Sequence, residues 1–208
     1  MKIIEPKVIL EDIINGQEIL KKIEKIGRVC YKSENNITEE SSEKFVRNII
    51  KSGHESVIEH ESISLRIICD RGVTHEIVRH RVASYSQEST RYCNYNSDKF
   101  GSELTFIKPC FWNEEDEAYK VWESSMKLIE DNYIKLISSG SKPQEARSIL
   151  PNSIKTEIVM TMNLREWRHF LKLRTDKAAH PQMREVAIQI LDMFKEKIPV
   201  IFDDIEVN

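Results

Sequence analysis

Apolar residues recur along this chain with two periods, one typical of helices and one typical of strands. In the first helical segment, spacings of three and four residues place the apolar positions on one face, at Ile19, Leu20, Ile23 and Ile26. The helical period, with its start and stop residues, predicts helices over residues 17–29, 38–52, 73–78, 114–138, 143–150, 164–173 and 181–197. Alternation with period two and short apolar runs predict strands over residues 7–10, 62–67, 104–107 and 154–162.

Cap and turn residues mark where several of these helices begin and end. Thr38 is expected to cap a helix that stops at Gly53, and Gly140 is expected to end the longest helix. Pro143 suits the first turn of a short helix. The segments follow one another without repeats, low-complexity stretches, linkers or a βαβ rhythm. We therefore expect a single domain over residues 1–208, of the α+β class, with mixed helices and a mainly antiparallel sheet.

Composition and charge argue against several classes of protein. The chain has 31 basic and 34 acidic residues among 208, and its net charge of −3 argues against a general nucleic-acid binder. The four cysteines form no CxxC pair and have no close spacing to histidine, which argues against a metal site or a disulfide scaffold. No apolar run approaches ~20 residues, and residues 1–5 do not resemble a signal peptide. We expect a soluble, cytoplasmic protein without a membrane partner.

In the middle of the chain the basic residues are arginines and not lysines. Lysine outnumbers arginine overall, yet residues 52–98 contain no lysine and five arginines. The planar guanidinium suits phosphate, carboxylate and the edges of flat heterocycles better than an ammonium does. Three cationic or potentially cationic side chains stand together here, at Arg79, His80 and Arg81, and Ser89 follows after seven further residues. This window is therefore the first candidate for a binding site.

The Arg-His-Arg run follows a predicted short helix, and its three side chains cannot share one face. Consecutive helical residues point about 100° apart, so the run must serve at least two surfaces. Short hydroxyls and a loop with free backbone N–H groups suit an anion, and they come from Ser84, Ser86, Ser89 and Thr90. A solvated basic helix end would explain an isolated Arg-His-Arg. With the hydroxyl-rich loop and Arg91 following, we favour an anion or nucleotide site.

The same run resembles the hallmark of the flavin-dependent thymidylate synthases, in which Arg-His-Arg, seven residues and a serine follow one another. Three further regions resemble segments of that family. The upstream one is Gly53-His54-Glu55-Ser56 with Glu59-His60, and the downstream ones are Glu145-Ala146-Arg147 with Leu150-Pro151, and Asn163-Leu164-Arg165 through Leu173-Arg174. Order and spacing are kept over residues 51–197. The match therefore covers most of the chain.

The resemblance implies an enzyme that methylates dUMP to dTMP, with 5,10-methylenetetrahydrofolate as carbon donor and NADPH-reduced FAD as hydride source. It also implies a homotetramer whose active sites are built from several subunits, which agrees with an Arg-His-Arg run that serves two surfaces. No metal and no nucleic-acid partner is expected. Because the flavin supplies the hydride, no cysteine nucleophile is needed.

The resemblance also assigns residues to each ligand. Flavin contacts are expected at Ser56, Arg79, His80, Arg81, Gln87, Asn163, Leu164, Arg165 and His169. Nucleotide contacts are expected at Glu76, Ile77, Val78, Arg79, Gln87, Glu88, Ser89, Thr90, Arg91, Arg147 and Arg174. The catalytic group is expected to comprise Arg174, Ser89 and His54, the last near flavin and folate. Gln87 stands where some members have glutamate, and Glu76 where some have glutamine.

The residues after the last predicted strand fit these roles. Arg174 lies on the same helical stripe as Trp167, where a charge is costly without a partner, although a snorkelling helix-end arginine is the ordinary alternative. A guanidinium aimed at the N3/O2 edge of uracil would stabilise developing negative charge. Arg165 and His169 share a different face, and Asn163 suits a helix N-cap.

The region around Ser89 offers candidates for the 5′-phosphate contact and for a nucleophile. Arg91 and Arg147, with backbone N–H groups near Ser89, suit the 5′-phosphate. Ser89 has no nucleophile-elbow motif around it, so we interpret it as a phosphate or base contact. Nothing near Cys93 marks it as an activated thiol.

Two other function classes remain open at this point. One is a nucleotide-sensing or single-stranded RNA-binding module that stacks bases on Tyr85, Tyr92 and Tyr95. The other is a structural oligomer whose arginines form interface ion pairs. The colour of the purified protein separates both from a flavoenzyme.

Overall fold

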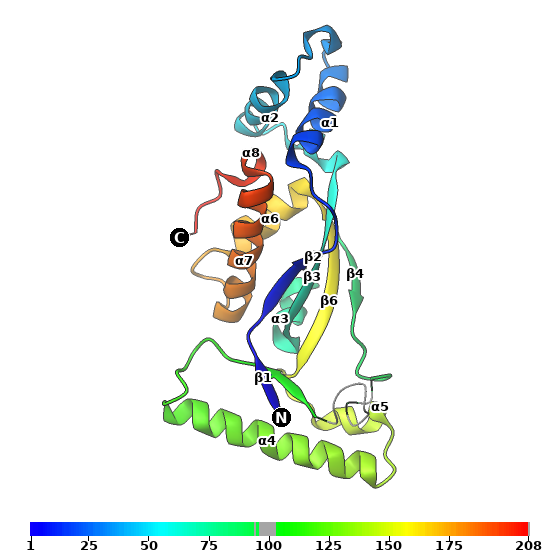
Figure 1. Cartoon of the computed structure of the whole chain (residues 1–208), viewed down its shortest axis with the longest axis vertical. Helices are drawn as coiled ribbons and strands as arrows, with labels where there is room; N and C mark the ends of the chain where they lie inside the picture. The colour runs from blue at the N-terminus through cyan, green and yellow to red at the C-terminus, as the bar shows by residue number, and fades with distance from the viewer. Residues whose placement is uncertain (94, 96–102, 208) are drawn as a thin grey trace. The chain divides into compact units, whose positions relative to one another are not determined.

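The computed structural model describes residues 1–93, 95 and 103–207 and divides the chain into two compact units (Figure 1). Several segments contribute to each unit. Unit 1 comprises Met1–Lys7, Ile67–Arg79 and Tyr85–Val159. Unit 2 comprises Val8–Arg66, His80–Ser84 and Met160–Asn208.

A four-stranded antiparallel sheet is the main β element. Its strands follow the order β2-β3-β6-β4, with the bounds Lys7–Leu10, Ser62–Asp70, Lys155–Asn163 and Ser84–Gln87. Within unit 2 the N–H of Leu164 donates to the carbonyl of Glu61 at 2.9 Å, and the hydroxyls of Ser64 and Thr161 lie 2.9 Å apart. These pairings run in opposite directions along β3 and β6, as an antiparallel ladder requires. Every second residue of β6 is buried, which is the period-two pattern of a strand with one face on the core.

Unit 1 adds a second, smaller sheet and a long helix. Strand β1 (Lys2–Ile4) pairs with β5 (Thr105–Ile107) in parallel. Helix α4 (Glu117–Ser138), the long green helix of Figure 1, contributes Met126 and Tyr133 to a buried cluster with Phe106. The remaining helices of this unit are α3 (Arg71–Ile77), α5 (Pro143–Ala146) and the 3₁₀ turn η4 (Arg147–Ile149).

Unit 2 is mainly helical. Helices α1 (Gly16–Val29) and α2 (Ser41–Lys51) pack side by side (Figure 1). Helices α6 (Leu164–Arg174), α7 (Pro181–Lys197) and α8 (Pro199–Phe202) share an aromatic core in which the rings of Trp167 and Phe194 lie 5.3 Å apart and those of Phe194 and Phe202 4.8 Å apart. Burial of such large rings is the main stabilising term of this unit. The 3₁₀ turns η1 (Glu34–Asn36) and η2 (Glu55–His60) complete it.

The structure confirms the α+β class and corrects some local predictions. Thr38 is not the cap of α2, because that helix begins at Ser41 after Glu40, and the Ser41 hydroxyl accepts from the Thr38 N–H at 2.9 Å. Residues 84–87, expected as part of a loop, form the outermost strand β4. Gly53 and Gly140 do end their helices, at φ +70° and +96°, where a side chain would be strained. None of the helices in the described residues combines the length and apolar character that a bilayer crossing requires.

Candidate active site

Helix α6 begins at the residue that the sequence assigned as its cap. The side-chain oxygen of Asn163 accepts a hydrogen bond from the N–H of Glu166 at 2.9 Å, which confirms the N-cap. Leu164 is fully buried and its N–H donates to the carbonyl of Glu61, so its flavin contact stays a prediction. Arg165 and His169, one helical turn apart, are both exposed. The cap therefore fixes where α6 begins, and helical spacing places Arg165 and His169 on one exposed side of it.

These residues line one cavity of unit 2, of about 550 Å³. Its wall comprises Glu55, Glu59, Val82, Asn163, Arg165, Glu166, His169 and Lys172. Arg165 donates to the carboxylate of Glu59 at 2.5 Å, so one of the cations at the cavity is already paired. The structure thus brings together Asn163, Arg165 and His169 at one cavity, and their contact with flavin stays a prediction.

A second cavity of unit 2, of about 370 Å³, contains the upstream motif. His54 and Ser56 line it together with Arg165, and both are exposed. Glu55 and Arg165 line both cavities, so the upstream motif and the start of α6 meet at shared walls. Exposed Tyr31 adds an aromatic face that the sequence did not single out.

His80 is buried, unlike its exposed neighbours Arg79 and Arg81. Its Nε2 accepts a hydrogen bond from Nε of Arg174 at 3.0 Å, and its ring meets that of Phe170 edge-on at 4.8 Å. Burial, reinforced by the charges of Arg174 and His169, lowers the pKa of His80 to about 4. His80 is therefore a neutral acceptor near neutral pH.

Three potential metal ligands also converge here. Ligand atoms of His80, Glu166 and His169 all lie within 4.8 Å of one another, a cluster that the sequence did not indicate. Because Nε2 of His80 accepts a hydrogen bond, the proton of the neutral ring is on Nδ1, which faces Glu166 at 3.8 Å. A protonated nitrogen offers no lone pair to a metal ion, so we interpret the cluster as an electrostatic pairing.

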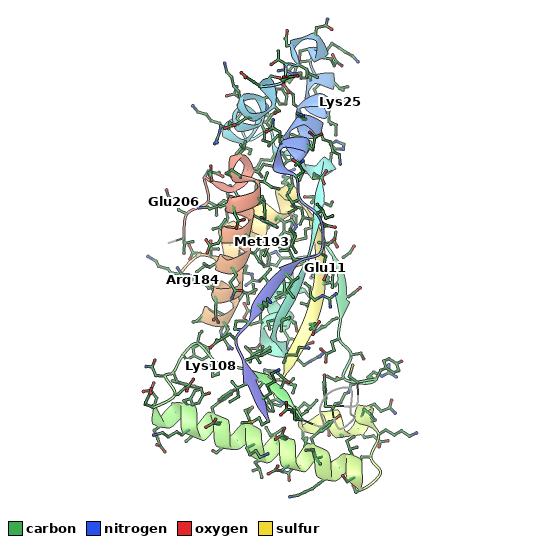
Figure 2. The ribbon with its side chains drawn as sticks, in the orientation of Figure 1. Glu11, Lys25, Lys108, Arg184, Met193 and Glu206 are labelled. Carbon is green, nitrogen blue, oxygen red and sulfur yellow. The ribbon has the colours of Figure 1, made fainter. Side chains whose placement is uncertain are left out.

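The end of α6 that carries Arg174 is held by main-chain contacts. The Thr175 hydroxyl donates to the Leu171 carbonyl at 2.8 Å, and the Thr175 carbonyl accepts from Nε of Arg184 at 3.0 Å. Arg184 lies on α7 (labelled in Figure 2). Arg174 is half-buried on the stripe of Trp167 and has a partner within the chain, so it is not a simple snorkelling helix end.

In unit 1, Gln87 lies in a network of hydroxyls. The Thr74 hydroxyl donates to the carbonyl of Arg71 at 2.9 Å, so its oxygen can accept from Nε2 of Gln87 at 3.0 Å. Nε2 also lies 3.4 Å from the hydroxyl oxygen of Thr156. This network orients the amide with its nitrogen toward the threonines, and it gives a reason for glutamine rather than glutamate at this position.

The carboxylate of Glu88 is bound by neighbouring side chains. It accepts from the Tyr95 hydroxyl at 2.7 Å and from Lys155 at 3.0 Å. Burial and the nearby Glu88 charge raise the pKa of Tyr95. The Glu88 N–H donates to the Glu157 carbonyl at 2.9 Å. A contact between Glu88 and the nucleotide thus needs either a rearrangement of these side chains or the use of the Glu88 main-chain carbonyl.

The loop after Glu88 departs from the expectation of free backbone N–H groups. The N–H groups of Tyr92 and Cys93 donate to the Ser89 carbonyl at 3.2 and 3.0 Å, and that of Arg91 donates to the Ser89 hydroxyl oxygen at 3.3 Å. For these three groups the prediction is wrong, because the chain forms a tight turn around Ser89. These three N–H groups are therefore engaged within the turn, and the side chains of the region remain predicted anion donors.

Those side chains include the two arginines predicted for the phosphate. Arg147 Nη1 lies 3.5 Å from the hydroxyl oxygen of buried Thr90, and Arg91 lies over the Tyr92 ring at 5.4 Å from its centroid. Both arginines are exposed. On α3 and just after it, Glu76 is half-buried, Ile77 is buried, and Val78 and Arg79 are exposed.

The predicted contacts divide between the two units. Apart from Arg174, every predicted nucleotide residue belongs to unit 1, and apart from Arg79 and Gln87, every predicted flavin residue belongs to unit 2. The chain passes from unit 1 to unit 2 between Arg79 and His80. The Arg-His-Arg run therefore contributes to both units, although α3 ends at Ile77 and the run itself is not helical.

Several residues at these cavities escaped the sequence reasoning. Lys172 lies three residues after His169 and seven after Arg165, so helical spacing could have placed it on the same face. Glu166 lies three residues before His169 and could have been found in the same way. Tyr31 carries no such signal, because it lies far from α6 in sequence, whereas Glu55 stands between His54 and Ser56 and could have been found from that motif.

Comparisons with known proteins show the family to which the chain belongs. A family model described as "Thymidylate synthase complementing protein" matches residues 13–200. The chain is 39% identical over 167 residues to the flavin-dependent thymidylate synthase of Pyrococcus furiosus, covering 80% of this chain and 68% of that protein. It is 35% identical over 185 residues to that of Geobacter sulfurreducens, covering 86% of this chain and 78% of that protein. Its fold resembles that of the UMP/dUMP methylase PolB from Streptomyces cacaoi, solved with 5-Br dUMP, at a TM-score of 0.77 and 23% identity over 98% of this chain and 96% of that chain.

Proposed function

We propose that this chain, which belongs to the flavin-dependent thymidylate synthase family, converts dUMP to dTMP with 5,10-methylenetetrahydrofolate as carbon donor and NADPH-reduced FAD as hydride source. The observation that carries the proposal is the convergence of Asn163, Arg165 and His169 on one cavity of about 550 Å³. Cavities of this size are typical of cofactor sites.

The residues around the unit 2 cavities fit a flavin dinucleotide. Arg165, His169 and Lys172 offer nitrogen donors to phosphate and ring acceptors, and Asn163 lies at the N-terminus of α6, where negative charge is favoured. Ser56 and His54 extend the polar wall toward the second cavity. When bound and reduced, FAD supplies the hydride.

The residues of unit 1, together with Arg174, bind and polarise the nucleotide. Arg91 and Arg147 bind the 5′-phosphate, because exposed guanidinium forks match its oxygens. Ser89 and Thr90 position the same phosphate or the base. Arg174 stabilises negative charge on the N3/O2 edge of the pyrimidine and so raises electron density at C5. His54 lies near flavin and folate and orients them.

The proposal extends to the assembly. The functional protein is a homotetramer of a single domain over residues 1–208, and residues of several subunits complete each active site. A chain whose Arg-His-Arg run contributes to two units is suited to this arrangement. We also propose a cytoplasmic location, which suits four cysteines that form no disulfide.

The proposal is tested by purifying the protein and measuring tritium release from C5-labelled dUMP. We expect a yellow tetramer that releases tritium only with both the reductant and the methylene donor, and omission of either is the control. A colourless protein that takes up no added FAD, or a monomer with full activity, would contradict the proposal.

The RNA-binding alternative loses support from the tyrosines on which it depended. Tyr95 is 6% exposed, and the Tyr85 hydroxyl donates to the carbonyl of Ile77 at 2.9 Å. Tyr92, 79% exposed, is the member of this trio that is open to a base. One open ring does not make the row of stacking platforms that such modules use.

A further inference from the structure

His80 and Arg174 come from two separate motifs and meet in unit 2. They are 94 residues apart in the sequence, yet Nε of Arg174 donates to Nε2 of His80 at 3.0 Å. One residue belongs to the Arg-His-Arg run and the other ends α6. The contact therefore links a predicted flavin residue to the predicted pyrimidine residue.

The imidazole has little freedom to turn. Its side chain is 4% exposed, and its ring packs edge-on against Phe170 at 4.8 Å and lies 6.1 Å from the ring of His169. Nδ1 faces Glu166 at 3.8 Å, which suits the tautomer with the proton on Nδ1. Packing and tautomer together direct the lone pair of Nε2 toward Arg174.

Arg174 is fixed from its other side by its own main chain. It is the last residue of α6, and Thr175, which follows it, is buried and bonded to Leu171 and Arg184. Because Nε carries the bond to His80, the pair of donors that suits a two-acceptor edge is Nη1 and Nη2. The direction of that pair is thus set by the bond at Nε.

We propose that His80 is a positioning residue for Arg174, which holds the guanidinium in the orientation that the pyrimidine edge requires. The inference rests on the proposed function, because it takes dUMP as the ligand of Arg174. It gives the histidine of the Arg-His-Arg run a role toward the nucleotide beyond the flavin contact that the resemblance assigns.

A double-mutant cycle tests the proposal. His80→Phe removes the acceptor but keeps an aromatic ring against Phe170, and it is combined with Arg174→Ala; dUMP affinity, FAD affinity, kcat and KM are measured for all four proteins. We expect His80→Phe to weaken dUMP binding about tenfold with Arg174 present and less than about twofold with Arg174 removed. His80→Gln, which keeps an acceptor, should restore part of the loss. If His80→Phe does not fold, His80→Leu closes the same cycle.

The outcomes distinguish a failure of the positioning role from a failure of the proposed function. Equal losses of dUMP affinity in both backgrounds, or a loss confined to FAD affinity, would overturn the positioning role in a protein that binds dUMP normally. Failure of the wild type to bind dUMP would overturn the proposed function and the inference with it. Nitrogen NMR of the histidine rings adds a direct readout, in which an unprotonated Nε2 of His80 is expected and a protonated one contradicts the proposal.

Discussion

The guanidinium of Arg168 makes two parallel hydrogen bonds with the carboxylate of Asp204, at 2.6 and 2.7 Å. Its Nε donates to Glu55 at 3.1 Å, and a further bond joins Nη1 to the carbonyl of Ile201. The side chain is 1% exposed. Arg168 therefore ties the C-terminal segment and the start of η2, which carries Ser56, to α6.

Arg168→Ala should lower the free energy of unfolding by about 1–3 kcal/mol, because it removes a hydrogen-bond donor from the carbonyl of fully buried Ile201. Arg47→Ala is the matched control: Arg47 forms an exposed i,i+4 pair with Glu43 at 3.0 Å, and its loss should cost less than about 1 kcal/mol. Urea denaturation of both variants measures the difference. Equal shifts of the two urea midpoints would show that the buried network around Arg168 stabilises the fold no more than an exposed ion pair does.

Arg174→Ala should abolish turnover and leave FAD binding largely intact, because its proposed ligand is the pyrimidine. Loss of one charge-stabilising donor costs about 10²–10³ in rate, and a charged fork can cost more. Arg174→Lys should rescue only in part, since lysine offers neither the Nε–H that meets His80 nor a two-donor fork. Separate titrations with dUMP and FAD, with turnover assays, distinguish the two ligands.

Leu173→Ala is the control for this pair, because Leu173 is half exposed on the same helix and belongs to no proposed contact. It should retain near-normal turnover. If Arg174→Ala also kept near-normal dUMP affinity and rate, Arg174 would be reduced to a structural role at the end of α6.

Cys93→Ala should keep substantial activity, because the hydride route needs no thiol adduct. The main-chain bond from the Cys93 N–H to the Ser89 carbonyl, at 3.0 Å, survives the substitution. The assay is tritium release from labelled dUMP, with FAD absorbance as the check on folding. A variant that folds and binds FAD yet shows no turnover would favour covalent catalysis by this thiol.

The buried imidazole of His80 should make stability depend on pH. Its pKa is about 4 in the folded protein and about 6.5 in the unfolded chain, so the unfolded state binds the proton first as the pH falls. The contribution is fully present above pH 6.5 and is lost progressively as the pH falls toward about 4. The slope approaches one proton, or about 1.4 kcal/mol per pH unit.

The check compares the unfolding free energy of wild type and His80→Phe between these pH values. Glu166 and His169 lie beside His80 and are present in both proteins, so only the difference between the curves reports this ring. Parallel curves would mean that the imidazole does not gain a proton on unfolding.

The elements that could be predicted are those whose signals are local. Helix α7 begins and ends where the sequence indicated, because Pro181 opens it and an apolar period runs to residue 197. Strand β4 could not be predicted, because its serine-rich residues resemble a loop and its place in the sheet depends on pairing with a distant strand.

In the site, too, the local features could be predicted and the long-range contact could not. The grouping of Arg165 with His169 follows from one helical turn, and the cap by Asn163 from a single residue. The bond between His80 and Arg174 had no local signal, because packing of α6 rather than sequence spacing brings them together.

The chain passes from one unit to the other after Lys7, Arg66, Arg79, Ser84 and Val159. No continuous stretch of the gene therefore encodes either unit by itself. A deletion, duplication or fusion with a breakpoint between Glu76 and His169 would divide both the proposed nucleotide residues and the proposed flavin residues. Because the two proposed sets are interleaved along the chain, single substitutions are the route by which evolution or an experimenter can change one and keep the other.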